Sequence, residues 1–191
     1  MQRNTFLKLC LAIGSIVTAP FDVYANLKER RRIEKGFKVD AGKGRFGDSI
    51  TPFDGDSFFT KVSTKDTDGD LYVFESTRLT KGGPALHYHY YQDEMWYVLE
   101  GEFLIKVGDK TYEAKAGDTV FGPRMVPHSM AKVGKKPGRL LITFQPAGKM
   151  EECFNKLSAG DTTGMTPEQR DNFRKEHGFE RVGGPITILK Q

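Results

Sequence analysis

The feature of this chain that most constrains its fold is a succession of short strand-like segments between residues 56 and 147. The segments are about 4–9 residues long, and turn-forming residues recur about every 8–12 residues. The expected strands are 58–63, 71–79, 85–91, 94–99, 102–107, 111–114, 119–122, 127–133 and 139–144. Strands this short and this regularly spaced predict an all-β sandwich or small barrel.

One connection between these strands has two interpretations. Residues 64–70 carry Asp66, Asp68 and Asp70 at alternate positions, as at the start of a calcium-binding EF-hand loop. That loop also requires a later glutamate and a helix on each side, and the sequence pattern contains neither. We therefore expect a hairpin turn here.

The first 25 residues have the pattern of a secretory signal peptide. Basic residues precede the apolar run Leu9–Val17, and small residues end at a cleavage site after Ala25. The run is too short to cross a bilayer, and Cys10 stands at the wrong end of it for lipid attachment after cleavage. We expect an exported protein, periplasmic or extracellular, without stable membrane insertion after cleavage. An uncleaved anchor and a buried first strand are the alternatives.

The rest of the chain divides into three expected parts. Residues 26–55 form an N-terminal arm, with one weak edge strand within the Gly- and Lys-rich segment 36–47. The barrel spans residues 56–147, and residues 148–191 supply helices and a tail. We expect this C-terminal part to be an appendage on the barrel or a dimer contact.

Two helices are expected in the C-terminal part. The first has apolar residues at i, i+3, i+4 and i+7, namely Met150, Cys153, Phe154 and Leu157. The second runs from Pro167 to about His177, and Thr166 and Gln169 form its capping box. Residues 185–189 are expected to return as a strand or to dock as a tail.

The charge argues against a nucleic-acid partner, and the cysteine content argues against stabilisation by a disulfide. The net charge of +4 is a mild basic excess. Its densest part, Lys28–Lys35, also contains Glu29 and Glu34, which favours a solvated tail over a nucleic-acid arm, so we expect no nucleic-acid partner. Cleavage would leave Cys153 as the only cysteine, so the fold must depend on its core and not on an intrachain disulfide.

Three of the four histidines fall in one pattern with a glutamate. His87 and His89 stand at i and i+2, so on a strand both imidazoles point the same way. Glu94 opens the next apolar run, and His128 lies in a separate segment punctuated by Gly and Pro. All four are metal-binding residue types.

Three neutral imidazoles and one carboxylate form a donor set for one divalent transition metal, with one or two coordination positions left open. The set fits Fe, Mn, Ni, Cu or Zn and does not choose among them. Open positions allow water, oxygen or a chelating substrate to bind side by side, as oxygen activation or carbonyl polarisation requires. Two alternatives stay open: histidines that hold no metal, and a metal that is catalytically idle.

The same residues carry a family resemblance. Residues 82–101, with His87, His89 and Glu94, resemble the first motif of the cupin superfamily, and residues 117–128 resemble its second motif. The resemblance implies a double-stranded β-helix, the jelly-roll cupin barrel, with a short C-terminal helical appendage. It implies His87, His89, Glu94 and His128 as metal ligands, with Glu94 also acting as catalytic base. The pattern is similar to single-domain, quercetin-dioxygenase-like cupins.

Two positions depart from the second cupin motif. Met125 stands where the family usually has glycine, which predicts different backbone torsions because Met does not readily adopt a positive φ. Lys132 stands where the family commonly has asparagine. The first departure concerns the loop before His128, and neither removes a metal ligand.

Strand alternation places further side chains around the four residues. Trp96 and Val98 share a side with Glu94, and Met130 shares a side with His128. Three phenylalanines could complete a lining for a flat apolar or phenolic ligand, although aromatic residues more often fill a core: Phe103, Phe121 and Phe144.

Five polar side chains near the motifs have no assigned role. Tyr88, Tyr90 and Tyr91 could hydrogen-bond to the ligands or pack on a strand face. Arg78 and Arg124 could bind an acidic substrate group or lie exposed.

The function expected first is that of a metal-dependent dioxygenase, an oxidoreductase, acting on a small aromatic or enolic compound. The alternatives are a non-enzymatic metal- or small-molecule-binding module of the cell envelope and a metal-assisted isomerase or lyase. In each case the partner is a small-molecule substrate or ligand. A homodimer is a further expectation from the resemblance.

Overall fold

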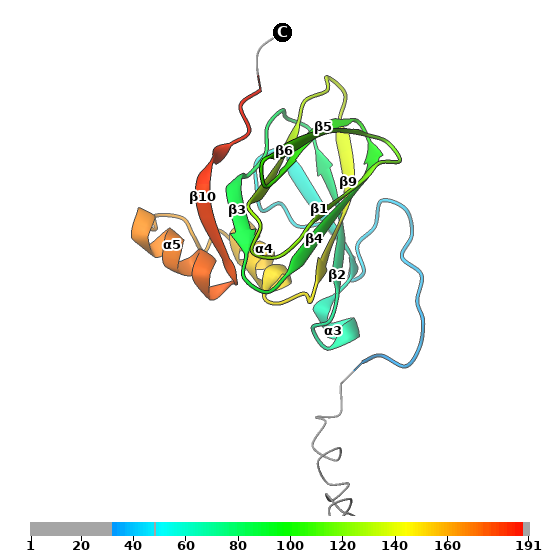
Figure 1. Ribbon diagram of the computed structural model, residues 1–191. Helices are drawn as coiled ribbons and strands as arrows, with labels where there is room; N and C mark the ends of the chain where they lie inside the picture. Colours follow the sequence, from blue (N-terminus) through cyan, green and yellow to red (C-terminus); the bar gives the residue numbers. More distant parts are fainter. Residues whose placement is uncertain (1–31, 48, 189–191) are drawn as a thin grey trace, which may run out of the picture. The chain divides into compact units, whose positions relative to one another are not determined.

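Two antiparallel sheets of five strands each pack face to face in the computed structural model, which describes residues 32–47 and 49–188 (Figure 1). This arrangement confirms the predicted all-β jelly roll. The expected signal peptide 1–25, with Cys10, and the basic residues before 32 lie outside the described residues. No helix in the described part of the chain is long and apolar enough to cross a membrane.

The strands fall close to the predicted segments. The structure has strands at Asp56–Val62 (β1), Tyr72–Arg78 (β2), Ala85–His89 (β3), Asp93–Glu100 (β4), Glu102–Val107 (β5), Lys110–Lys115 (β6), Thr119–Gly122 (β7), His128–Lys132 (β8), Gly138–Gln145 (β9) and Phe179–Pro185 (β10). The helices are Thr64–Thr67 (α3), Met150–Ala159 (α4) and Pro167–Glu176 (α5). The two predicted C-terminal helices are thereby confirmed.

The strand order explains how distant segments meet. The first sheet has the order β1-β2-β9-β4-β7, and the second has the order β10-β3-β8-β5-β6. The chain crosses between the sheets at most steps from β2 to β9, for example from β3 to β4 to β5, whereas β5 and β6 are neighbours in one sheet. As a result, β3 and β8, which are far apart in the sequence, lie side by side in the second sheet.

The hydrophobic core lies between the two sheets. Leu140, Ile142 and Phe144 alternate along β9 and are buried, as a strand with one inward face requires. They pack in one cluster with aromatic side chains of β2 and β4, among them Phe74 and Trp96. Each fully buried side chain of this size contributes about 1.5–3 kcal/mol to the free energy of unfolding, which accounts for stability without a disulfide. Cys153 is free and buried.

Two predictions before β2 were incomplete or wrong. Segment 36–47 forms no strand and has only an isolated bridge between Gly44 and Gly47. Residues 64–70 do connect two antiparallel strands, but they begin with the helical turn α3. Ser63 and Asp66 form a capping box for this turn. This pattern favours a helical turn and was not considered when Asp66 was compared with a calcium-loop residue.

The returning strand at the C-terminus begins earlier than predicted. It was expected at residues 185–189, whereas β10 spans Phe179–Pro185, and Leu189 is outside the described residues. β10 pairs with β3 and so extends the second sheet (Figure 1). The C-terminal part of the chain therefore contributes a strand to the sheet itself.

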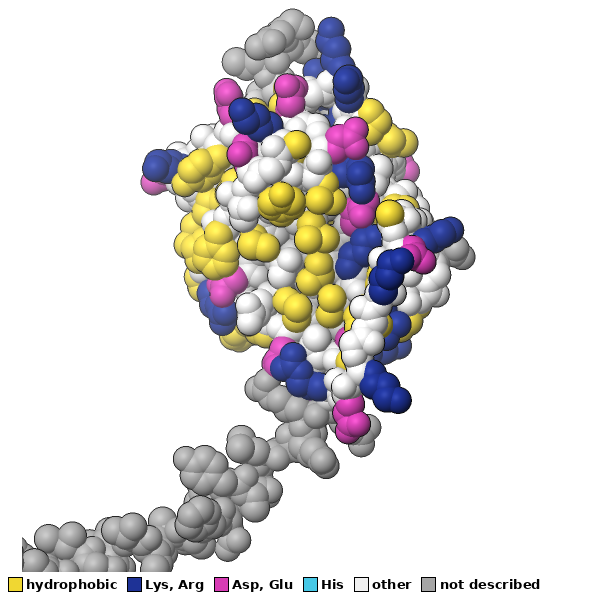
Figure 2. All heavy atoms as spheres, turned by 90° about the vertical axis from the view of Figure 1, so that its right-hand side faces the viewer, with side chains coloured by type: hydrophobic (Ala, Val, Ile, Leu, Met, Phe, Trp, Pro, Cys, Tyr) yellow, Lys and Arg dark blue, Asp and Glu magenta, His cyan; other side chains and the backbone are white. Residues whose placement is uncertain are grey.

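One outer face of the molecule is rich in hydrophobic side chains. Figure 2 shows them gathered near the middle of the face, with lysine and arginine side chains around them. Tyr97 on β4 and Phe121 on β7 are among the exposed large hydrophobic residues. The expected homodimer stays a prediction.

Candidate metal centre

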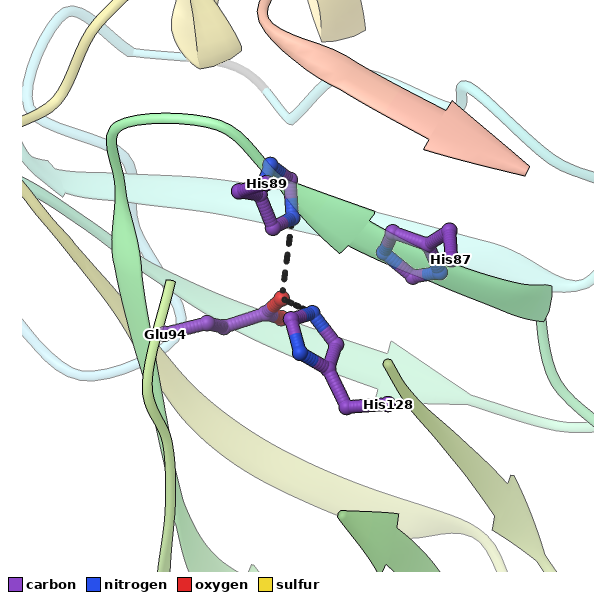
Figure 3. Close-up of side chains that lie close together, drawn as sticks. All are labelled: His87, His89, Glu94 and His128. Atoms are coloured by element: carbon purple, nitrogen blue, oxygen red, sulfur yellow. Dashed lines mark ion pairs between the residues drawn. The ribbon is translucent and has the colours of Figure 1, made fainter. Parts of the chain in front are cut away.

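The four predicted ligand residues converge between the two sheets. His87 and His89 come from β3, Glu94 comes from β4 and His128 comes from β8 (Figure 3). One potential ligand atom from each residue lies within 4.8 Å of those of the others. We call these four residues the His/Glu cluster.

Backbone register brings the cluster together. The i, i+2 spacing puts the His87 and His89 side chains on the same face of β3, as predicted. His87 pairs directly with His128 of the neighbouring strand β8. Glu94 approaches from the opposite sheet, where it pairs with Phe144 of β9. The cluster therefore joins both layers of the fold.

Backbone carbonyls define the tautomers of two imidazoles. His87 Nδ1 lies 2.8 Å from the carbonyl oxygen of Ala85, and His128 Nδ1 lies 2.9 Å from that of Val126. Because a carbonyl oxygen only accepts, each Nδ1 must carry the proton and donate it. The Nε2 atom of each neutral ring therefore carries a lone pair that can bind a cation.

The carboxylate of Glu94 faces these nitrogens. Its Oε2 lies 3.3 Å from His89 Nε2 and 3.2 Å from His128 Nε2 (Figure 3). These three atoms are buried, yet they have no hydrogen bond of acceptable geometry in the described structure. Buried polar atoms without partners lower the free energy of unfolding, so a proton or a metal ion is expected between these atoms.

The pKa values of two imidazoles of the cluster suit metal binding. Burial, followed by the neighbouring His89 and His128, lowers the pKa of His87 to about 4, and burial also lowers the pKa of His89. Neutral imidazoles beside an ionised carboxylate are the protonation states that metal binding requires. The residues present fit a divalent metal ion.

A cavity of about 520 Å³ adjoins the cluster. His87, His89 and Glu94 form part of its wall. Aromatic rings surround the cluster: the ring of Phe144 is centred 5.1 Å from that of His89, and the ring of Phe179 is centred 5.8 Å from that of His87. The wall beside the candidate metal ligands is therefore largely apolar.

Only some of the residues predicted to line a binding site border the cavity. Trp96, Met130 and Phe144 line the cavity, whereas Val98 and Phe103 are packed in the core. Phe121 is not part of the lining, since its side chain is 56% exposed. Strand parity identified inward positions correctly, but it does not say which of them border empty space.

The polar residues without an assigned role also lie in different surroundings. The hydroxyls of Tyr88 and Tyr90 donate to Glu180 of β10. Arg124 forms an ion pair with Asp93 and does not line the cavity, whereas the buried Arg78 does.

The loop before His128 keeps a left-handed residue in spite of its sequence. Met125 has a φ of 63°, so the prediction that methionine would change the torsions here was wrong. Its amide donates to the carbonyl oxygen of His89 at 2.8 Å, which ties this loop to β3. Lys132 is buried, and its ammonium donates to the carbonyl oxygen of Gly134.

Several residues of the cavity wall come from the C-terminal part and were not predicted as site residues. They include Phe154 of α4, Arg174 of α5 and Phe179 and Arg181 of β10. Alternation along 179–181 was a usable signal, since it puts Phe179 and Arg181 on one face of a strand. Placing that strand beside β3, however, requires a pairing between distant segments.

Comparison with known proteins identifies the fold family. Residues 75–144 match the family described as cupin domain. An uncharacterized protein of Methanocaldococcus jannaschii is 34% identical over 67 residues, which are 35% of this chain and 54% of that protein. The chain thus spans about half the length of this curated relative.

Solved structures agree with this assignment. An RmlC-like cupin from Shewanella frigidimarina has 22% identity and a TM-score of 0.50, over 61% of this chain and 96% of that one. KdgF from Halomonas sp. has 17% identity and a TM-score of 0.50, over 59% and 94% of the two chains. At these identities the likeness is one of fold. The sheet topology and the match over residues 75–144 together identify a cupin domain in this chain.

Proposed function

We propose that the chain is a metal-dependent dioxygenase acting on a small aromatic or enolic compound. His87, His89, Glu94 and His128 would hold the metal. The observation that carries the proposal is the set of buried, unpartnered Nε2 and Oε2 atoms converging at the wall of a cavity of about 520 Å³. A bound redox-active ion would supply oxygen activation and polarisation of an enol or phenol oxygen.

The surrounding residues support a flat substrate. Trp96, Phe144 and Phe179 all border the cavity and lie beside the imidazoles of the cluster. Such rings orient a planar molecule by stacking and edge contacts, and they exclude water from it. A cavity of this volume falls within the range of small-molecule sites, about 300–1,000 Å³.

Glu94 is the proposed catalytic residue as well as a ligand. Its carboxylate borders the cavity, and one oxygen has no hydrogen bond among the described residues. It is therefore placed to accept the proton of an enolic or phenolic hydroxyl that enters the site. The buried position keeps this proton transfer away from bulk water.

The test is oxygen uptake by protein loaded in turn with Fe, Mn, Ni, Cu or Zn, with a panel of flavonols and β-diketones. We expect uptake with at least one metal and substrate, and none with His128→Ala. His177→Gln is the matched control, because His177 is a buried histidine of the described chain that lies outside the cluster. Elemental analysis of protein from its native compartment identifies the metal, since affinity order alone can load the wrong ion in a foreign host.

The same assay separates the alternatives. Substrate turnover without oxygen would replace the dioxygenase by a metal-assisted isomerase or lyase. Ligand-induced thermal stabilisation without any turnover would leave a non-enzymatic binding module. No metal bound by the purified protein or by the reconstituted protein would overturn the dioxygenase and the metal-assisted isomerase or lyase.

We also propose that the protein is exported to the periplasm or outside the cell. The pattern of residues 1–25 supports this proposal. Mass spectrometry of the protein from its native host should find a mature chain beginning after Ala25 outside the cell membrane. An intact chain retained inside the cell would contradict export.

A further inference from the structure

Three arginines from the C-terminal elements line the cavity. Arg170 and Arg174 come from α5, and Arg181 comes from β10. These elements follow the segment 75–144 that matches the cupin family. We call the three residues the C-terminal arginines. Their position in the wall makes them candidates for selecting what enters.

Arg181 lies next to the His/Glu cluster. In the pairing of β10 with β3, Arg181 is directly opposite His87, and Phe179 is opposite His89. Directly opposed residues on antiparallel strands project to the same side of the sheet. Glu180 projects to the other side, where the hydroxyls of Tyr88 and Tyr90 donate to it. Alternation therefore places Arg181, an exposed residue that lines the cavity, on the side of the sheet that carries the cluster, and Glu180 on the other side.

Arg174 adds a partly buried guanidinium from the helix. It stands one turn after Arg170 on the same face of α5. Its side chain is 21% exposed and pairs with Asp171 through Nη2, while its Nε is buried without a hydrogen-bond partner. The charge of Asp171 also acts on Arg181, but no ion pair joins the two among the described residues. Donors therefore remain for a ligand.

The charge of the cavity wall is unbalanced. Glu94 is the only acidic residue among the described residues that line the cavity, and it belongs to the metal cluster. A fourth arginine of the wall, Arg78, is already paired with the buried Asp56, with Nη2 3.0 Å from Oδ2. The C-terminal arginines have no comparable counterpart in the wall. Guanidinium groups in such a wall bind carboxylates through charge-assisted, often bidentate, hydrogen bonds.

Another part of the wall is apolar. Phe154 of α4 packs edge-on against Phe58 and Phe74, and all three rings line the cavity. This surface provides no counterpart for a charge. It fits the hydrocarbon or aromatic body of a ligand whose anionic group lies elsewhere.

We propose that the substrate is a carboxylic acid with an apolar body, and that Arg181 and Arg174 bind its carboxylate. This inference rests on the proposed function, since it names the substrate class of the same cavity. Arg181 lies beside His87, so a carboxylate held there leaves the rest of the molecule to the cavity, whose wall includes the phenylalanine surface. The C-terminal elements thereby determine specificity.

The experiment compares acids with amides of the same shape. The probes are benzoate and benzamide, cinnamate and cinnamamide, and 2-naphthoate and 2-naphthamide, measured by calorimetric titration of the full-length protein. We expect at least one acid to bind at least tenfold more tightly than its amide, and this preference to weaken with salt. No preference in any pair overturns the proposal.

Single substitutions locate the preference. We expect Arg181→Gln and Arg174→Gln each to weaken acid binding about tenfold and to leave amide binding within about twofold. Lys175→Gln is the matched control, because it removes the same charge from the next residue of α5, which does not line the cavity. An equal loss in Lys175→Gln would show a general charge effect and overturn the assignment.

The same titrations distinguish this inference from the proposed function. They are run with and without added metal and on His128→Ala. A preference for acids that depends on Arg181 but survives in His128→Ala supports the carboxylate site even if metal-dependent activity fails. Metal-dependent activity toward amides and acids alike would support the proposed function and reject the carboxylate site.

Discussion

At the scale of single residues, the orientation of the imidazoles is set by the backbone. His87 and His128 each donate Nδ1–H to the carbonyl oxygen two residues earlier, of Ala85 and Val126. A short, local bond of this kind determines which nitrogen faces the cluster. The rings are therefore held in a metal-binding orientation by their own strands.

The first prediction concerns His128. His128→Ala removes one of four donor atoms, and we expect stoichiometric metal binding to be lost while the barrel stays folded. Metal content is measured by elemental analysis, and folding is measured by far-UV circular dichroism. Full metal content in the variant would remove His128 from the ligand set.

The second prediction concerns Met125, which has a φ of 63° in the loop before His128. A left-handed residue with a side chain costs about 1–2 kcal/mol. Glycine removes this strain, but part of the gain is lost because glycine increases the conformational entropy of the unfolded chain. We expect Met125→Gly to raise the free energy of unfolding by about 0.5–1 kcal/mol in urea titrations, and Met125→Val to lower it by more than 1 kcal/mol. A less stable glycine variant would contradict this account.

At the scale of elements, β10 determines the surroundings of the ligand strand. The second sheet has the order β10-β3-β8-β5-β6, so β3 has neighbours on both sides. On its other side, β3 lies against β8, and the segment before β3 is joined to β8 by a bridge between Gly82 and Lys132. The spacing of β3 and β8 thus depends on a close approach of the two backbones at Gly82 and Gly83.

The third prediction tests this approach. A Cβ added at Gly83 would lie 1.6 Å from the carbonyl oxygen of Met130 in β8, which neither backbone can accommodate without moving. We expect Gly83→Ala to lower the free energy of unfolding by about 3 kcal/mol and to weaken metal binding, because β8 carries His128. Gly184→Ala is the control, since a Cβ there meets nothing within 4 Å. Equal stability of the two variants in urea would refute the close approach.

At the scale of the whole molecule, the His/Glu cluster connects the two layers. β3 and β8 belong to one sheet, and β4, which carries Glu94, belongs to the other. An ion held by all four residues would link the sheets across the core. Unfolding would then have to separate its ligands, so metal binding would stabilise the folded state.

The fourth prediction is a thermal shift on metal addition. At a free metal concentration of 100 times Kd, binding to the folded state adds about 2.7 kcal/mol to the free energy of unfolding. For a chain of this size we expect Tm to rise by about 5–10 °C in calorimetry, and to fall back on chelation. His128→Ala should show no such rise. An equal shift in that variant would mean that the ion binds elsewhere.

Local patterns account for the part of this structure that could be predicted. The parity of His87 and His89 within one strand, the apolar alternation of β9 and the capping box of α5 all involve neighbouring residues. The resemblance to the cupin motifs predicted that His128 lies close to the other three residues of the His/Glu cluster. Arg181 could not be assigned in this way, because its role depends on pairing between β10 and β3, about 90 residues apart in the chain.

The burial of Cys153 has a practical consequence for measuring the opening of this protein. Its side chain is fully buried in α4, and burial raises the pKa of the thiol to about 12. Since the thiolate is the reactive form, alkylating reagents should modify it only when the surrounding structure opens. In a Cys10→Ser chain, the labelling rate of this single thiol would therefore report how often α4 detaches, and would show whether a bound metal or acid slows that event.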